Sequence, residues 1–126
     1  MAASMTLEQK VLSGGRWLSS SKSYSAGLRV SLINEPIPLG TDTVLNVAID
    51  VSAVKSFFLI SDVNVTIETN DGTTPTDTLN LIAGVPYIWN TDSLDSFLLT
   101  GDVTKFFITN ASDAIIDMEA VADPTP

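Results

Sequence analysis

The side chains of this 126-residue chain that could act in catalysis are mainly carboxylates, since it has fifteen acidic residues and no histidine. Asp92 and Asp95 lie in a loop expected over residues 91–101, and Asp102 follows directly. Two carboxylates that flank a sugar can hydrolyse a glycosidic bond. Asp is also common in turns, because its side chain accepts hydrogen bonds from nearby backbone amides. We therefore interpret these three aspartates as turn residues.

Nucleophilic catalysis lacks its usual general base in this sequence. Histidine and cysteine are both absent, which excludes Ser-His-Asp and Cys-His arrangements. A serine activated by Lys55 or Lys105 stays formally possible, but neither lysine lies in a recognisable signature. We therefore predict that the protein is not an enzyme and needs no cofactor.

Calcium is the metal most compatible with this composition, because it is bound by oxygen ligands alone. Such ligands could come from residues 70–72 with Asp77, or from Asp92 with Asp95. Neither set has the spacing of an EF-hand loop, and residues 70–72 read Asn-Asp-Gly, a typical turn sequence. We predict ordinary turns and no metal site.

Two aromatic residues, Tyr87 and Trp89, alternate with Ile88 in a predicted strand. If their rings are exposed, they would form a stacking platform for a glycan or a nucleobase. If the rings are buried, they belong to the core. A period of two does not tell which face meets water, so core packing is the preferred interpretation and the platform stays an alternative.

The charges are divided unevenly along the chain. Residues 1–29 hold four basic residues and one acid, a net charge of +3, whereas residues 30–126 hold two lysines and fourteen acids, a net charge of −12. The basic leader also contains tryptophan and tyrosine, which are common interface anchors. We predict an extended N-terminal arm over residues 1–27 that binds a partner. The residues expected to carry this attachment are Arg16, Trp17, Lys22, Tyr24 and Arg29.

The acidic body disfavours two classes of partner. With a pI near 4.1 it would repel phosphate, so no nucleic acid partner is expected, and nucleic acid binding by the basic leader alone is the weaker alternative. No apolar run reaches the roughly 18–20 residues that span a bilayer. Residues 1–12 lack the pattern of a secretory signal. We predict no membrane partner and synthesis in a cytoplasm.

Local signals in the arm predict little regular structure. Thr6 and Gln9 fit a capping box, so residues 6–12 could form one or two helical turns, which are marginal without packing. Residues 13–27 hold six serines and three glycines, a composition typical of a flexible segment. We expect a short helix followed by a flexible stretch.

Residues 28–126 are predicted to form one β-rich domain. Period-two or short apolar runs predict strands at 28–32, 45–51, 55–60, 63–68, 78–82, 85–89, 103–109 and 114–121. Two prolines within Glu35–Gly40 predict an extended connector there. Eight short strands separated by turn signals predict an all-β fold, an antiparallel and jelly-roll-like β-sandwich.

Several segments of the body resemble small structural proteins of tailed bacteriophages. They are Ile49-Asp-Val-Ser52, Val54-Lys-Ser-Phe-Phe-Leu-Ile-Ser-Asp62, Thr66-Ile-Glu-Thr-Asn70, Leu79-Asn-Leu-Ile-Ala-Gly-Val-Pro-Tyr-Ile-Trp89, Gly101-Asp-Val-Thr-Lys-Phe-Phe-Ile-Thr-Asn110 and Asp123-Pro-Thr-Pro126. The chain is similar over about residues 45–126 to the capsid decoration, or cement, proteins of such phages. These segments correspond to predicted strands and turns and include no catalytic signature.

The resemblance implies a β-rich module on the exterior of an icosahedral virion. Such a protein binds the major capsid protein and its own copies, as a homotrimer or a dimer, and stabilises the shell against the pressure of packaged DNA. It implies no cofactor, and it implies attachment through a terminal arm or a flat base. The alternative function is a receptor- or glycan-binding module of a phage head or tail fibre, with Tyr87 and Trp89 at its site.

Overall fold

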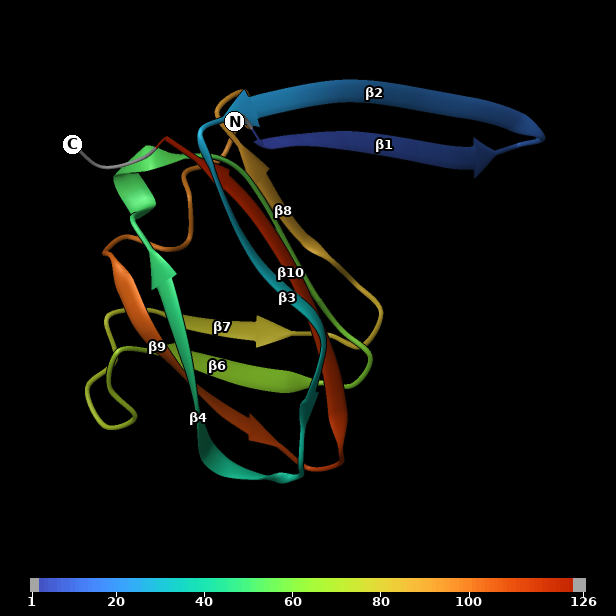
Figure 1. The fold of residues 1–126 in the computed structure, drawn as a ribbon. Helices are drawn as coiled ribbons and strands as arrows, with labels where there is room; N and C mark the ends of the chain where they lie inside the picture. The colour runs from blue at the N-terminus through green and yellow to red at the C-terminus, as the bar shows by residue number, and fades with distance from the viewer. Residues whose placement is uncertain (1–2, 124–126) are drawn as a thin grey trace.

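The computed structural model describes residues 3–123 and is all-β, with antiparallel sheets as predicted (Figure 1). Its strands are β1 (Ala3–Ser13), β2 (Arg16–Ala26), β3 (Leu28–Ile37), β4 (Gly40–Ile49), β5 (Val54–Ser61), β6 (Val65–Thr69), β7 (Thr78–Leu81), β8 (Tyr87–Asn90), β9 (Val103–Asn110) and β10 (Ala114–Ala122). A 3-10 turn, η1 (Val51–Ala53), precedes β5. Within residues 3–123, no helix is long and apolar enough to cross a bilayer.

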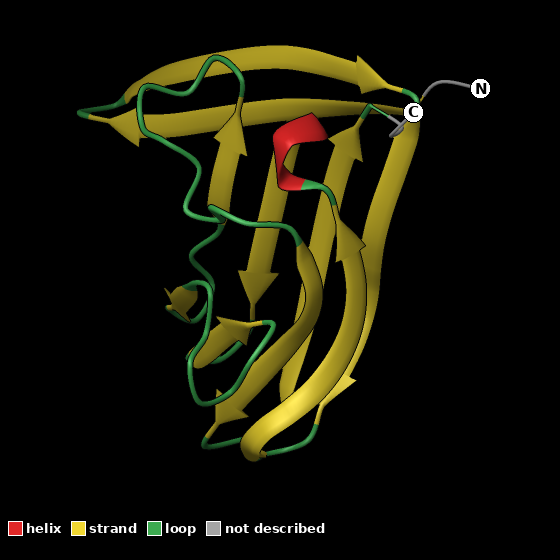
Figure 2. Ribbon diagram, turned by 90° about the vertical axis from the view of Figure 1, so that its left-hand side faces the viewer, coloured by secondary structure: helices red, strands yellow, loops and turns green. Residues whose placement is uncertain are grey.

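The body consists of two four-stranded sheets, which Figure 2 shows as separate groups of strands. One sheet has the strand order β3-β10-β5-β8, and the other has the order β4-β9-β6-β7. The chain crosses from one sheet to the other at every connection of the body except the one between β6 and β7. This arrangement is consistent with the predicted β-sandwich.

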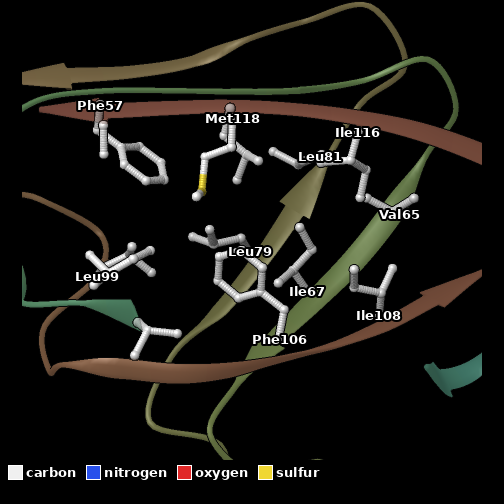
Figure 3. Packing of buried hydrophobic residues seen from close by; sticks show 14 of the residues in the cluster. Phe57, Val65, Ile67, Leu79, Leu81, Leu99, Phe106, Ile108, Ile116 and Met118 are labelled. Atoms are coloured by element: carbon white, nitrogen blue, oxygen red, sulfur yellow. The ribbon is translucent and has the colours of Figure 1, made fainter. Parts of the chain in front are cut away.

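The hydrophobic core lies between the two sheets (Figure 3). Its fully buried side chains include Phe57, Leu59, Ile116 and Met118 from the first sheet and Ile67, Phe106 and Ile108 from the second. The burial of β6 follows the predicted period of two, because Val65 and Ile67 are buried whereas Thr66 and Glu68 are only half-buried. Apolar alternation in the sequence therefore identified the core face of this strand correctly.

Strand β3 continues through a segment predicted to be a connector. It reaches Ile37, and Pro36 lies opposite Ile115 of β10. Because β3 is at the edge of its sheet, only one of its sides needs a hydrogen-bonded neighbour, and proline is tolerated there. The prolines of Glu35–Gly40 therefore mark an edge strand and the turn that follows it. Residues 124–126, where the family resemblance ends, lie outside the described residues.

Candidate functional site: an amino-terminal hairpin

The first two strands form a hairpin that projects from one end of the body (Figure 1). Their pairing runs without a register shift from Ala3 opposite Ala26 to Ser13 opposite Arg16. The predicted helix over residues 6–12 is wrong, and so is the flexible stretch over residues 13–27. A two-residue Gly-Gly loop flanked by two segments of equal length favours a hairpin, and the cross-strand ladder outweighs the weak capping signal.

The turn depends on the conformational freedom of its two glycines. Gly14 has φ of 58° and Gly15 has φ of 77°, as a type I′ hairpin turn requires. Open space surrounds both positions, because an added Cβ would have no atom within 4 Å apart from those of the adjoining residues. A substitution there therefore acts through backbone strain and not through a clash.

We expect Gly15→Val to destabilise the hairpin by about 1–2 kcal/mol, the cost of placing a side chain in the left-handed region. Amide hydrogen exchange along β1 and β2 should then accelerate, while exchange in the body stays unchanged. Gly15→Asn is the matched control, because asparagine tolerates positive φ. Equal exchange rates in the two variants would contradict this account of the turn.

The base of the hairpin packs on the body through one of its two faces. Tyr24 and Ala26 are buried together with Val121 of β10, and Tyr24 is only 9% exposed. Met5, directly across from Tyr24, is partly buried against the same cluster. Since cross-strand partners point to the same face of a sheet, these residues form one continuous apolar contact that fixes the root of the hairpin.

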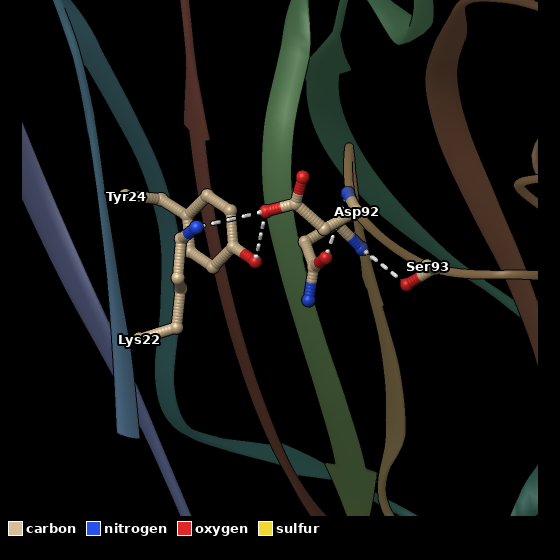
Figure 4. Close-up of polar contacts among 5 residues, drawn as sticks. Lys22, Tyr24, Asp92 and Ser93 are labelled. Carbon is tan, nitrogen blue, oxygen red and sulfur yellow. Dashed lines mark hydrogen bonds and ion pairs between the residues drawn. The ribbon is translucent and has the colours of Figure 1, made fainter. Parts of the chain in front are cut away.

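A polar contact beside this cluster holds the hairpin to the loop after β8 (Figure 4). The Tyr24 hydroxyl donates a hydrogen bond of 3.0 Å to Oδ2 of Asp92, and Lys22 Nζ lies 3.4 Å from the same oxygen. The Asp92 amide donates to Oδ1 of Asn90 at 3.0 Å, which orders the turn that carries the carboxylate. Lys22 and Asp92 are largely exposed, so the geometry of this contact matters more than its charge attraction.

These contacts shift two pKa values in opposite directions. The hydrogen bond from Tyr24 lowers the pKa of Asp92 below its ordinary 3.8, and Lys22 adds to this effect. Burial, and next the hydrogen bond to Asp92, raises the pKa of Tyr24 above its ordinary 10.0. Docking of the hairpin is therefore strongest between these two ordinary values. It weakens as pH falls through the lowered pKa of Asp92, and as pH rises through the raised pKa of Tyr24.

Because the hydrogen bond from Tyr24 is the largest cause of the shift at Asp92, Tyr24→Phe should move that pKa back toward 3.8. We expect the NMR titration midpoint of the Asp92 carboxyl to rise in Tyr24→Phe and also in Lys22→Met, because each variant removes a contact that lowers this pKa. An unchanged midpoint in Tyr24→Phe would contradict the hydrogen bond between Tyr24 and Asp92.

Arg29 of β3 provides a further contact between the body and the start of the hairpin. Its Nη2 donates to the carbonyl oxygen of Ser4, and its Nε lies 3.7 Å from Oε2 of Glu119. The Ser31 hydroxyl donates to the same glutamate oxygen at 2.9 Å. Two residues of β3 therefore share one carboxylate on β10, and Arg29 also links β3 to the start of β1.

The distal end of the hairpin is apolar, basic and exposed. Trp17 is 64% exposed, and its cross-strand partner Leu12 is exposed as well. The pair Val11 and Leu18 lies one position further from the turn, and both side chains are also exposed. Arg16 directly follows the turn. Four large apolar side chains in water at the end of a free hairpin mark an interaction surface.

The structure thus divides the five predicted attachment residues into three groups. Lys22 and Tyr24 meet at Asp92, Arg29 lies against Ser4 and Glu119, and Arg16 and Trp17 lie at the free tip. No local pattern in the sequence indicates Asp92 as a docking partner. The apolar partners of Trp17 at the tip were also missed, although pairing the strands across Gly14-Gly15 would have found them.

Tyr87 and Trp89, the alternative stacking platform, both contact the loop over residues 91–101. Trp89 stacks on Phe97 with ring centroids 4.5 Å apart, and its indole N–H donates to the Asp95 carbonyl oxygen at 3.0 Å. The Leu98 amide donates to the Tyr87 hydroxyl at 3.0 Å. Burial is the main cause that raises the pKa of Tyr87. Both rings therefore contribute to the structure of this loop.

An open groove of about 670 Å³ runs beside the same loop. Tyr87, Trp89, Leu94, Asp95 and Leu98 are among its lining residues. Leu94 is fully exposed, and Leu98 is 54% exposed. The groove thus combines apolar side chains with a carboxylate.

The carboxylates considered as calcium ligands are used in turns. Two backbone amides, of Thr73 and Thr74, lower the pKa of Asp71 by donating to its carboxylate. The Thr100 amide and hydroxyl both donate to Asp77, at 2.8 Å each. In the described part of the chain, no three acidic side chains gather in a way that could hold a metal ion.

Comparison with protein-family models, with curated proteins and with solved structures gave no match for this chain.

Proposed function

We propose that the protein is a capsid decoration, or cement, protein that binds the outer surface of a major capsid protein shell, binds its own copies and stabilises the shell. The observation that carries this proposal is the hairpin, which places a basic and apolar tip away from an acidic body. Such a projecting contact suits a structural protein that attaches to a lattice through a terminal arm. The family resemblance of residues 45–126 supports the same assignment.

The topology of the body supports the proposal of a jelly roll. When the eight body strands are counted from β3 to β10, the sheet orders become 1-8-3-6 and 2-7-4-5. This is the strand order of two interlocked Greek keys, an architecture found in viral capsid and lectin domains. Fold alone does not assign a function, so the hairpin carries the argument and the topology agrees with it.

Within the hairpin, we assign the shell contact to Trp17 and its partner Leu12. A tryptophan that is 64% exposed at a projecting tip can bury a large apolar surface in a pocket of a partner. Such anchors contribute about 2 kcal/mol or more to binding. Lys22, Tyr24 and Arg29 act indirectly, because they hold the hairpin on the body.

The alternative of a glycan-binding module rested on Tyr87 and Trp89. The Trp89 ring is stacked on Phe97, and its N–H is bonded to a backbone carbonyl. The Tyr87 hydroxyl accepts a backbone hydrogen bond. Since these polar groups already have partners within the chain, they give little support to sugar recognition, and the cement function is preferred.

The test is a binding isotherm of the purified protein on DNA-free capsid shells, combined with the temperature at which the shells break. We expect saturable binding and a higher rupture temperature. Trp17→Ala should weaken binding at least about tenfold, whereas Ile33→Ala, at an exposed position of β3 on the body, should leave shell binding unchanged. Saturable binding to a glycan array without binding to shells would favour the alternative.

A further inference from the structure

The two faces of the hairpin tip differ in their residues. Side chains at alternate positions of a strand share one face, so Arg16 and Leu18 lie on the face that carries Lys22 and Tyr24 at the base. Trp17 lies on the opposite face. A tip that uses Trp17 to bind the shell therefore leaves the face of Arg16 and Leu18 available to another molecule.

Strand β2 carries the same chemical combination twice on this face. At the base, Lys22 pairs with Asp92 while Tyr24, two residues on, is buried against the body. Nearer the turn, Arg16 is likewise followed two residues later by an apolar side chain, Leu18. Leu18 is 46% exposed, and in the described range 3–123 no ion pair includes Arg16. Arg16 and Leu18 thus repeat the basic and apolar pair formed by Lys22 and Tyr24, but they have no docking partner among the described residues of the same molecule.

The body of the same molecule does not reach this part of the hairpin. Arg16 lies six residues beyond Lys22, a distance of about 20 Å along an extended strand. A two-stranded ribbon by itself is marginally stable in water. Contact with another molecule would therefore stabilise the outer half of the hairpin.

The groove beside the 91–101 loop has the complementary chemistry. It presents Leu94 and Leu98, both exposed, together with Asp95. Among the residues that the structure describes, no basic side chain forms an ion pair with Asp95. The groove begins near Asp92, the carboxylate that receives Lys22 of the same chain. A volume of about 670 Å³ is large enough to admit apolar side chains from a strand.

We propose that the hairpin face of Val11, Arg16 and Leu18 docks in the groove of a second copy of this chain, with Arg16 against Asp95. The opposite net charges of residues 1–29 and 30–126, +3 and −12, favour the acidic body of another copy as the partner. Such a contact joins two different surfaces, so it closes into a ring or continues as a chain of subunits. The proposed function includes binding between copies of this chain, and this inference assigns the surfaces of that contact. It rests on the proposed function only for its biological setting.

Sedimentation velocity of the full-length protein over a concentration series, without shells, tests the docking. We expect reversible association of the wild type. Leu18→Asp and Leu94→Asp should each raise the dissociation constant at least about tenfold, because each would bury an unpaired charge in the contact. Both side chains are exposed in the single molecule, so the fold should be retained. A wild type that stays monomeric, or a Leu94→Asp variant that associates normally, overturns the proposal.

Exchanging the charges of Arg16 and Asp95 tests the proposed ion pair between these two residues. Arg16→Glu and Asp95→Lys should each weaken association at least about threefold, and the double variant should restore it. Glu35→Lys makes the same charge change as Asp95→Lys on β3, at the opposite edge of the sheet from β8, and should have no effect. Failure of the double variant to recover would contradict the Arg16–Asp95 contact.

The two proposals fail separately in these experiments. Association of the wild type without any binding to shells would retain the hairpin docking and remove the cement function. Shell binding by a protein that is monomeric at all concentrations would retain the cement function and remove the docking. Trp17→Ala, on the opposite hairpin face, is expected to weaken shell binding.

Discussion

Removal of residues 1–27 is expected to abolish co-sedimentation of the protein with capsid shells, with a loss of affinity of at least about a hundredfold. The deletion removes the Trp17 anchor, for which about 2 kcal/mol is expected. It also removes the face of Arg16 and Leu18 that we propose binds a neighbouring copy. Loss of the self-contact multiplies the loss of affinity, because a lattice of linked subunits binds with avidity.

The deletion also uncovers part of the body, so it needs a control. Val121 is fully buried beneath Tyr24 and Ala26, and exposing one valine costs about 1.5–3 kcal/mol of stability. The thermal midpoint of the truncated chain must therefore be measured alongside its binding. In the full-length protein, the double variant Trp17→Ala and Leu18→Asp should reproduce the loss of shell binding at unchanged stability. Undiminished binding by the truncated chain would refute attachment through the hairpin.

Phe106→Ala should produce the largest loss of stability among single substitutions discussed for this protein. The Phe106 side chain is fully buried on the central strand β9, between β4 and β6 (Figure 3). Its removal leaves a cavity and should lower the free energy of unfolding by roughly 3–5 kcal/mol. A domain of this size is typically stable by about 5–15 kcal/mol. The variant should therefore unfold at a much lower denaturant concentration, as followed by circular dichroism.

Leu94→Ala is the matched control for the core variant. Leu94 is also large and apolar, but it is fully exposed. Its truncation should change the free energy of unfolding by no more than about 0.5 kcal/mol. Comparable losses in Phe106→Ala and Leu94→Ala would mean that the core is not between the two sheets.

The body could be predicted from the sequence, because its strands have a visible hydrophobic period. Val65 and Ile67 alternate with polar residues and point into the core, and similar patterns located the other strands of both sheets. The pairing order of the strands was not predictable, since it depends on contacts between segments far apart in the chain. The segment around Pro36 was predicted to be a connector for a related reason. Only the strand order of the sheet shows that β3 is an edge strand, where proline is tolerated.

The arm was harder to predict, because most of β2 has no hydrophobic period. Ser19, Ser20 and Ser21 follow one another in this strand, and serine favours neither strand nor helix strongly. Regular pairing with β1 across Gly14-Gly15 forms the strand all the same. The docking of Tyr24 on Asp92 joins residues 68 positions apart, so no local pattern could indicate it. Arg16 and Trp17 were predicted as attachment residues from their residue types, and only the structure shows that both are exposed at the tip.

The most direct measurement of the central claim is the copy number of this chain in purified virions, determined by quantitative mass spectrometry against the major capsid protein. The cement function predicts a fixed ratio to the major capsid protein, with copies distributed over the whole shell. The chain should also be released by mild treatment that leaves the packaged DNA inside. A copy number at or below that of the fivefold vertices, or absence from the virion, would contradict the proposed function.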